Sequence, residues 1–501
     1  MHGMTIGYLA ERNARKWPDR EAVVHRANGE RLVTHTFEAF DDRTDRLAAG
    51  LAERGVEKGD SVALYTKNNA ETLEAFVGAM KLGALVVPVN HRFKGEEVRY
   101  VLEDSDASLC LVDDFGAETL ADVRDAVDHV VSVDDPPSFA DSYEALLADD
   151  PTTLDADVGR LDEAGIMYTS GTTGDPKGCV YTHDNLVQLA QDAAEAWAFL
   201  EPGNRHLVST PLFHVGAFVP FLNNFYAGGA TVVVDGFDAE RTLSLIEAER
   251  VNSTYLVPTQ TRMLLDLDAF DAFDVSSLDT YSTGAAPVGA ALKRETMDRF
   301  DCDVIETFGQ TEALCLHLLP DDAIEKADSV GESMLNLGAK VVDEGGEELP
   351  PGEVGRIAYR GPTVFDRYHG MPEKTAEVFD DGWFVSDDLV HRDEDGFFHF
   401  VGRADDMIIT GGENVHPAEI EEVLHDHPDI AEVAVIGVPD QEWGEAVKAC
   451  VVAAEGSSLS QSDVVAHVAA RLADFKKPRR VEFYDELPRN PTGKVLKSEL
   501  A

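Results

Sequence analysis

Strand-like and helical segments alternate near the N-terminus, and this alternation is the strongest constraint on the fold of the chain. Short apolar runs are followed by stretches in which apolar side chains recur with the helical period. The strand patterns cover residues 61–65, 85–89 and 108–112, and the helical patterns cover residues 70–82 and 94–103. Strands separated by helices of about 10–15 residues are typical of βαβ units with a largely parallel sheet. The sequence therefore predicts a wound α/β scaffold.

The same alternation returns in a second unit between residues 231 and 257. After Gly331, alternating side chains and glycine turns predict a short antiparallel β subdomain. We therefore expect an α/β protein in two domains. Residues 1–403 would form a large domain of two wound α/β subdomains plus a small β subdomain, and residues 404–501 a small α+β domain. Further strand and helix patterns near the N-terminus cover residues 22–24, 31–34 and 37–53.

The charge of the chain is strongly unbalanced, with 94 acidic and 42 basic residues and a formal net charge of −52. Acidic pairs such as Asp113–Asp114 and Asp380–Asp381 are spread along the chain and form no acidic tail. Such a field repels nucleic acids and anionic membrane surfaces. We expect a soluble protein from the salt-rich cytoplasm of a halophile, where screening weakens the self-repulsion. A single basic partner is the alternative explanation.

The cysteines and the apolar runs indicate the cellular environment in which the protein works. The five cysteines are far apart and form no CxxC or His/Cys cluster, which argues against a zinc site or a disulfide framework. No apolar run reaches the ~18 residues of a membrane-spanning helix, and no signal peptide is recognisable. We expect a cytoplasmic protein without stable membrane insertion.

One polar loop stands out by its composition. Residues 168–178 read YTSGTTGDPKG, so glycines and hydroxyl residues alternate ahead of a proline and a lysine. Glycines let backbone amides approach a ligand closely, and amides, hydroxyls and a lysine together suit phosphate. The string is not a Walker A motif, because no Gly-Lys-Ser/Thr triplet opens the following helix. A flexible polar turn is the alternative interpretation.

This loop resembles the phosphate-binding loop of the acyl-adenylate-forming superfamily, and further strings resemble the other motifs of that family in order. Because the matches span nearly the whole chain, we interpret it as an acyl-CoA synthetase or acid–CoA ligase that uses ATP. The strings are PLFH at 211–214, TGAAP at 283–287, ETFGQTE at 306–312, SDD at 386–388, VGR at 401–403, TGGEN at 410–414 and PRNPTGK at 488–494.

The resemblance implies roles for residues of these strings. It places Thr311 on phosphate, Glu312 on Mg²⁺ and Phe308 on adenine. Asp388 would bind ribose, and Arg403 would contact ribose or phosphate. The remaining nucleotide-binding residues would be Thr169, Ser170, Gly171, Thr172, Thr173, Gly174, Lys177, Gly284, Ala285, Ala286, Pro287 and Thr307.

The family pattern also implies how the acid and the thiol are handled. His214 would lie beside the acyl pocket, and Lys494 would enter the active site during adenylation. Gly411 and Gly412 would line the channel for the pantetheine arm of coenzyme A. The C-terminal domain would be mobile, with its hinge at about Asp406.

Each string also has a plainer interpretation, and two positions depart from the family pattern. A lone histidine among apolar residues is usually a packed residue, and a lysine in a polar loop is usually solvated. ETFGQTE and TGGEN can be ordinary turns. Phe308 replaces a tyrosine but keeps the aromatic face. Asp387 replaces a glycine. Either it reflects the acidic bias of the chain, or its carboxylate next to Asp388 disturbs the turn or the metal balance.

The reaction implied by the resemblance has two steps. The carboxylate of an acid attacks the α-phosphate of MgATP to give acyl-AMP and pyrophosphate, and the thiol of coenzyme A then displaces AMP. We expect a fatty acid; aryl acids such as 2-succinylbenzoate come second, and an amino acid is disfavoured because PLFH has no acidic neighbour. The rivals are a ligase loading a carrier protein, a luciferase-like oxygenase and a non-catalytic nucleotide-binding protein. The oligomeric state stays open, with a homodimer as one option.

Overall fold

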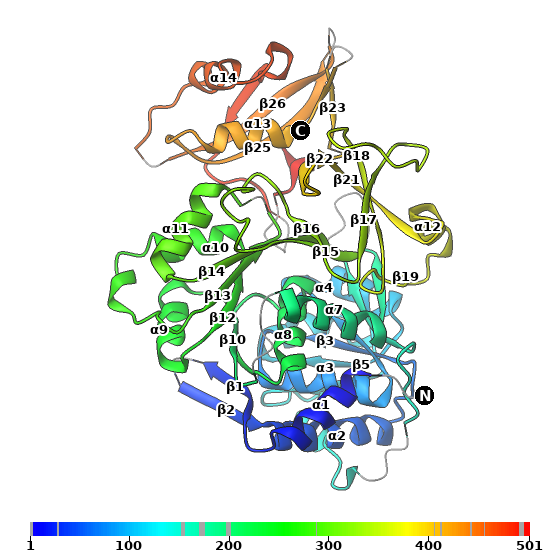
Figure 1. The fold of residues 1–501 in the computed structure, drawn as a ribbon. Helices are drawn as coiled ribbons and strands as arrows, with labels where there is room; N and C mark the ends of the chain where they lie inside the picture. The colour runs from blue at the N-terminus through cyan, green and yellow to red at the C-terminus, as the bar shows by residue number, and fades with distance from the viewer. Residues whose placement is uncertain are drawn as a thin grey trace. The chain divides into compact units, whose positions relative to one another are not determined.

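The chain folds into a large and a small compact unit (Figure 1). The large unit combines Met1–Gly338 with Tyr359–Glu377, and the small unit combines Ala339–Ala358 with Val378–Ala501. Both units mix helices and strands, which confirms the predicted α/β class with a large N-terminal and a small C-terminal part. The domain boundary after residue 403 stays a prediction. The computed structural model describes residues 4–27, 30–151, 156–169, 176–196, 202–286, 288–404, 406–410, 413–440, 443–454, 456–489 and 495–500.

One mixed sheet of the large unit has the strand order β19-β9-β8-β4-β3-β5-β6-β7. Its centre is parallel, because β3 (Ser61–Tyr65) pairs in parallel with both β4 (Leu85–Pro88) and β5 (Ala107–Val112). The connecting helices are α3 (Ala70–Leu82) and α4 (Gly95–Asp104), so the expected βαβ units are present. The other strands are β6 (His129–Ser132), β7 (Asp141–Ser142), β8 (Glu163–Tyr168), β9 (Gly178–Thr182) and β19 (Arg367–Tyr368).

Local signals set the ends of the helices. The Asn69 side chain accepts a hydrogen bond of 2.7 Å from the first turn of α3, and Gly83 ends that helix with a φ of 85°. Thr36 caps α2 (Phe37–Glu53) in the same way, and α2 has the bounds that its apolar spacing predicted. Within the described part of the chain, no helix combines the length and the apolar character needed to span a bilayer. Further helices of this unit are α1 (Ile6–Lys16), α5 (Asp114–Asp122), α6 (Tyr143–Leu146), α7 (His183–Ala196) and α8 (Val215–Ala227).

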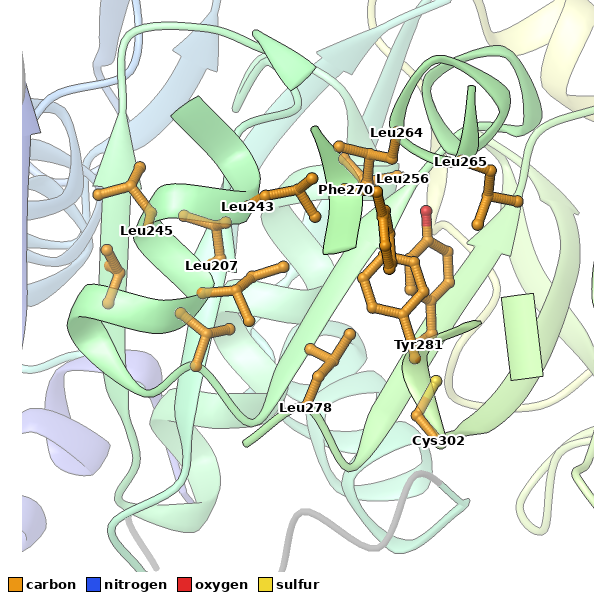
Figure 2. Packing of buried hydrophobic residues seen from close by; sticks show 14 of the residues in the cluster. Leu207, Leu243, Leu245, Leu256, Leu264, Leu265, Phe270, Leu278, Tyr281 and Cys302 are labelled. Atoms are coloured by element: carbon orange, nitrogen blue, oxygen red, sulfur yellow. The ribbon is translucent and has the colours of Figure 1, made fainter. Parts of the chain in front are cut away.

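A second mixed sheet of the large unit has the order β16-β15-β14-β13-β12-β10-β11-β1-β2. Neighbouring strands from β14 to β1 run parallel, and antiparallel strands flank them at both edges. Helices α9 (Ala239–Glu249), α10 (Pro258–Leu265) and α11 (Ala290–Phe300) cover one face (Figure 1), and their apolar side chains share one buried core with the strands (Figure 2). The strands are β1 (Glu21–Ala27), β2 (Glu30–Thr36), β10 (Arg205–Val208), β11 (Ala230–Val234), β12 (Ser253–Leu256), β13 (Thr280–Gly284), β14 (Asp303–Gln310), β15 (Ala313–Leu318) and β16 (Glu332–Ser333).

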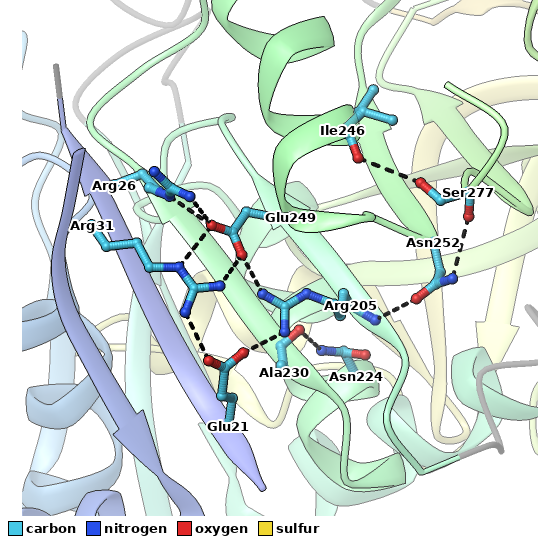
Figure 3. Close-up of polar contacts among 10 residues, drawn as sticks. All are labelled: Glu21, Arg26, Arg31, Arg205, Asn224, Ala230, Ile246, Glu249, Asn252 and Ser277. Carbon is cyan, nitrogen blue, oxygen red and sulfur yellow. Dashed lines mark hydrogen bonds and ion pairs between the residues drawn. The ribbon is translucent and has the colours of Figure 1, made fainter. Parts of the chain in front are cut away.

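An ion-pair cluster joins the N-terminal strands to this sheet (Figure 3). The side chain of Glu249, at the end of α9, is fully buried and accepts hydrogen bonds from three arginines. Nε of Arg26 and Nε of Arg31 lie 2.7 and 2.9 Å from its Oε1, and Nη2 of Arg205 lies 2.5 Å from its Oε2. Glu21 pairs with Arg31 and Arg205 at 2.8 and 2.5 Å. The cluster therefore holds β1, β2, β10 and α9 together.

The small unit contains two sheets. The first has the order β17-β18-β21-β20 with β22 paired to β21, and it forms the β subdomain expected after Gly331. The second has the order β24-β23-β26-β25 with β27 paired to β26, and it packs against α13 (Pro417–His425) and α14 (Gln461–Ala469). The strands are β17 (Gly338–Val342), β18 (Gly355–Arg360), β20 (Phe379–Asp380), β21 (Trp383–Arg392), β22 (Phe398–Arg403), β23 (Ile408–Thr410), β24 (Glu413–Val415), β25 (Ile430–Asp440), β26 (Gly444–Ala453) and β27 (Arg480–Phe483), and α12 (Pro372–Val378) precedes β20.

Candidate active site

Strands β8 and β9 bring the two ends of the glycine-rich loop together. They pair antiparallel, with Tyr168 opposite Gly178. The N–H of Thr169 donates to the carbonyl oxygen of Lys177 at 2.9 Å, and the N–H of Lys177 donates to Oγ1 of Thr169 at 3.2 Å. Thr169 and Lys177 therefore form the closed base of one loop. The predicted loop residues outside the described part of the chain are Ser170, Gly171, Thr172, Thr173 and Gly174.

Helix α4 holds both sides of this loop base. The Tyr100 hydroxyl donates to the carbonyl oxygen of Pro176 at 3.0 Å, and the Tyr168 hydroxyl donates to Oδ2 of Asp104 at 2.7 Å. Burial, together with the nearby Asp104 carboxylate, raises the pKa of Tyr168, so its hydroxyl remains a donor at neutral pH. The motifs did not predict this tether, because Tyr100 and Asp104 belong to none of the strings that carry the family resemblance.

The turn between β14 and β15 carries the predicted metal-binding carboxylate. Glu312 is 7 % exposed, and the Tyr368 hydroxyl donates to its Oε1 at 2.7 Å. The ammonium nitrogen of Lys177 lies 4.8 Å from the centre of the Tyr368 ring. The Tyr181 hydroxyl on β9 donates to the carbonyl oxygen of Thr311. The structure thus brings together the predicted Lys177, Thr311 and Glu312, and it adds Tyr368, which was not predicted.

The ends of β13 and β14 form the expected adenine side of the site. Gly284 lies opposite Thr307 in the parallel pair. Ala285 follows with a φ of 66°, a left-handed conformation that costs a non-glycine residue free energy. Phe308 is half-buried on β14. Pro287 lies outside the described residues. Five of the predicted residues thus lie in one region, at the two strand ends and the start of the next loop. They are Gly284, Ala285, Ala286, Thr307 and Phe308.

Replacing Gly284 with alanine is expected to weaken ATP binding. The added Cβ would lie 2.2 Å from the backbone oxygen of Thr307, so β13 and β14 would have to separate. Overpacking typically costs roughly 1–3 kcal/mol, which corresponds to about a tenfold or larger loss of affinity if the adenine side bears it. Calorimetric titration with a non-hydrolysable ATP analogue measures the loss. The control is Gly289→Ala in the same connection, whose added Cβ meets nothing within 4 Å. Unchanged affinity of Gly284→Ala would contradict the assignment.

His214 lies at the N-terminal end of α8. The preceding segment is held by Asn68, whose side-chain oxygen accepts a hydrogen bond of 2.8 Å from the N–H of Leu212. Burial, together with the nearby Arg92 and His91, lowers the pKa of His214 to about 4. The imidazole is therefore neutral at physiological pH and provides no cation for a carboxylate.

Aromatic side chains lie close to His214 and to the first turn of α8. The ring of Phe213 lies 4.4 Å from that of His214 and 5.1 Å from that of His91, between ring centres. The ring of Tyr255 lies close to the first turn of α8, within 3.4 Å of the position that a Cβ on Gly216 would take. This region is therefore rich in flat, apolar surfaces.

In the small unit, the predicted ribose-binding residues lie on adjacent strands. Asp388 on β21 is opposite Arg403 on β22, and Nη1 of Arg403 lies 3.3 Å from Oδ1 of Asp388. The Ser386 hydroxyl donates to Oδ2 of Asp388 at 3.1 Å. Asp387 faces the opposite side of β21, where it is exposed and lies 3.6 Å from Arg356. Asp387 and Asp388 therefore keep the regular alternation of a strand, in which successive residues face opposite sides. The effect of Asp387 on the nucleotide or the metal stays untested.

Four predicted positions of the C-terminal part remain to be placed. Asp406, the predicted hinge, follows β22, and Nζ of Lys497 lies 3.9 Å from its Oδ2. Gly411, Gly412 and Lys494 lie outside the described residues. Their roles stay predictions.

Comparison with known proteins gives consistent matches over the whole chain. The family model described as AMP-binding enzyme matches residues 10–369, and the model of the AMP-binding enzyme C-terminal domain matches residues 419–494. A feruloyl-CoA synthase of Amycolatopsis is 39% identical over 503 residues, covering 100% of this chain and 99% of the relative. The long-chain-fatty-acid–CoA ligase FadD13 of Mycobacterium tuberculosis is 34% identical, covering 99% and 97%. The crystal structure of ATP-bound MatB from Rhodopseudomonas palustris superimposes with a TM-score of 0.89 at 31% identity, covering 99% and 98%.

Proposed function

The chain belongs to the AMP-binding enzyme family, and from this premise we propose that it joins a carboxylic acid to coenzyme A with MgATP. The observation that carries the proposal is the cluster in which Lys177 and Glu312 both contact Tyr368, next to the base of the glycine-rich loop. A lysine for phosphate and a carboxylate for a metal ion are the two charges needed to hold MgATP.

Each part of the nucleotide would have its own set of residues. The loop between Thr169 and Lys177 would hold the β- and γ-phosphates with amides and hydroxyls, which leaves the α-phosphorus open to the acid. Phe308 would stack on adenine. Asp388 and Arg403, already paired at 3.3 Å, would bind the ribose hydroxyls. The adenine side would be completed by Gly284, Ala285, Ala286, Pro287 and Thr307.

Glu312 fits a magnesium ligand by its chemistry. Its Oε1 accepts a hydrogen bond from Tyr368, and carboxylate oxygens are the ligands that a hard cation prefers. Bound Mg²⁺ would neutralise charge on the phosphate oxygens during transfer. Phosphate oxygens and water would complete the coordination, because the described residues include no cluster of three or more side chains able to hold a metal ion.

The proposed reaction has two steps. An oxygen of the acid attacks the α-phosphorus, and the bond to pyrophosphate breaks as the new bond forms. The thiol sulfur of coenzyme A then attacks the acyl carbon, the bond to AMP breaks, and the thiol proton is released. Lys494 would stabilise the charge of the first step, and Gly411 and Gly412 would leave room for the pantetheine arm in the second. A rotation of the C-terminal part about Asp406 would separate the steps.

An aromatic acid is our first choice of substrate, and a fatty acid is the second. The sequence alone favoured a fatty acid. The contacts of Phe213 with His214 and the ring of Tyr255 next to Gly216 favour a flat substrate, because aromatic rings stack on one another. The feruloyl-CoA synthase relative supports the aromatic choice, and the FadD13 relative supports the fatty acid. A carrier-protein thiol is the alternative acceptor.

A panel of acids with ATP, Mg²⁺ and coenzyme A tests the proposal. The assay should be run at high salt, since a net charge of −52 suits a protein of a saline cytoplasm. We expect acyl-CoA, AMP and pyrophosphate in equal amounts, with the highest kcat/KM for an aromatic acid such as ferulate. Long-chain fatty acids and 2-succinylbenzoate serve as the competing substrates, and a carrier protein serves as the competing acceptor. Formation of ADP, or turnover without any acid, would contradict the mechanism.

A further inference from the structure

We propose that Tyr368 keeps Lys177 and Glu312 apart, so that both charges stay available to the nucleotide and its metal instead of pairing with each other. Tyr368 is then a positioning residue for MgATP. The inference rests on the proposed function, because it takes the phosphate role of Lys177 and the metal role of Glu312 as given.

Two parts of one side chain contact the two charged groups. The Tyr368 hydroxyl donates to Oε1 of Glu312 at 2.7 Å, and the face of its ring lies 4.8 Å from Nζ of Lys177. A hydroxyl donor stabilises a carboxylate without cancelling its charge, and the face of an aromatic ring attracts an ammonium group. Each charged group therefore has a neutral partner.

Without this side chain the two charges would attract each other strongly. The flexible stem of Lys177 can move its ammonium group over several ångströms, and Glu312 is only 7 % exposed, so water screens it weakly. The thiol of Cys179 is close enough to respond to both: burial raises its pKa, Glu312 raises it further, and Lys177 lowers it. An ion pair between Lys177 and Glu312 would cancel the positive charge needed for phosphate and the negative charge needed for Mg²⁺.

The backbone fixes Tyr368 between the two groups. Strand β19 pairs with β9, the strand that follows the loop, and places Tyr368 opposite Cys179. Three residues earlier, the N–H of Phe365 donates to the carbonyl oxygen of Glu312 at 2.9 Å. The rings of Phe365 and Tyr368 lie 4.8 Å apart between their centres. One short segment is therefore attached to both the strand next to Lys177 and the turn of Glu312.

Two substitutions at Tyr368 distinguish the hydroxyl contact with Glu312 from the ring contact with Lys177. Tyr368→Phe keeps the ring for Lys177 and removes the hydroxyl from Glu312, so we expect the gain in ATP affinity on adding Mg²⁺ to fall roughly tenfold, the size of one hydrogen bond to a charged group. ATP affinity in EDTA should stay unchanged. Tyr368→Leu removes both contacts, so ATP affinity in EDTA should also fall, by about tenfold, as Lys177 pairs with Glu312. Calorimetric titration of ATP with Mg²⁺ and with EDTA measures both quantities.

A second substitution identifies the cause of the loss. In the Tyr368→Leu protein, Glu312→Gln removes the charge that captures Lys177, so ATP affinity in EDTA should return to that of Glu312→Gln alone. A merely structural role of Tyr368 predicts no such rescue, and its absence would overturn the proposal. So would wild-type affinity of Tyr368→Leu in EDTA. If the wild-type protein itself binds no ATP, the proposed function fails instead.

Tyr143→Phe is the matched control. The Tyr143 hydroxyl donates to Oε2 of the buried Glu74 at 2.8 Å, which is the same chemical contact at another place in the large unit. We expect Tyr143→Phe to lower the unfolding temperature about as much as Tyr368→Phe and to leave both ATP affinities unchanged. A loss of Mg²⁺-dependent affinity in Tyr143→Phe would overturn the specific role of Tyr368.

Discussion

Replacement of Lys494 by alanine is expected to slow acyl-adenylate formation by roughly 10²- to 10³-fold, the usual cost of removing one preorganised stabiliser of developing charge. Thioester formation from supplied acyl-AMP should stay close to the wild-type rate. The first step brings an anionic acid against an anionic phosphate, whereas in the second a thiol attacks an uncharged acyl carbon. Isotope exchange between pyrophosphate and ATP measures the first step, and acyl-CoA formation from synthetic acyl-AMP measures the second.

The control for this substitution is Lys374→Ala. Lys374 is an exposed lysine that pairs with Glu377 at 2.8 Å, and its loss should change neither half-reaction. If Lys494→Ala slowed both half-reactions equally, Lys494 would have no specific role in adenylation.

Replacement of Glu249 by glutamine is expected to lower the free energy of unfolding by about 3–5 kcal/mol, the range for breaking a buried ion pair by removing one partner. Burial alone raises the pKa of the Glu249 carboxyl, yet hydrogen bonds from Arg31 and Arg26 and the charge of Arg205 hold its pKa below the usual range. The carboxylate is therefore ionised at neutral pH. Without its charge, three guanidinium groups would lose the carboxylate that they share, while Glu21 would still contact two of them, Arg31 and Arg205.

Urea unfolding of Glu249→Gln, followed by circular dichroism, measures this loss. The control is Glu21→Gln in the same cluster. Glu21 has a side chain that is 32% exposed, and such a pair is worth about 1 kcal/mol or less. Equal shifts of the urea midpoint for the two variants would show that burial does not set the strength of the cluster.

Local sequence patterns predicted the bounds of helices and strands better than they predicted which strands pair with each other. The spacing of apolar residues gave the bounds of α2, Phe37–Glu53, and the centre of the parallel sheet around β3, because caps and periodicity act over a few residues. The position of β1 next to β11 in the second sheet, with Val23 opposite Thr231, had no sequence signal. Such pairing depends on packing between segments far apart in the chain.

The same limit applies to the candidate site. The motif strings named both Lys177 and Glu312, and the structure places both in contact with Tyr368. Tyr368 itself was missed, because its partner Glu312 is 56 positions away and an aromatic residue in a strand usually belongs to the core. The sequence left the effect of Asp387 open, and the alternation of β21 places this residue on the exposed face of the strand. The spacing of residues along the sequence does not reveal a residue that acts through contacts with distant parts of the chain.

The chain passes from one unit to the other three times, after Gly338, after Ala358 and after Glu377. Neither unit can therefore be excised by a single cut. A fragment that stopped at Gly338 would contain the glycine-rich loop and Glu312, but it would lack β19. The outer side of β9 would then be an open strand edge with free amides and carbonyls, a surface prone to aggregation. Efforts to express the nucleotide-binding part alone must accordingly retain the returning segment Tyr359–Glu377.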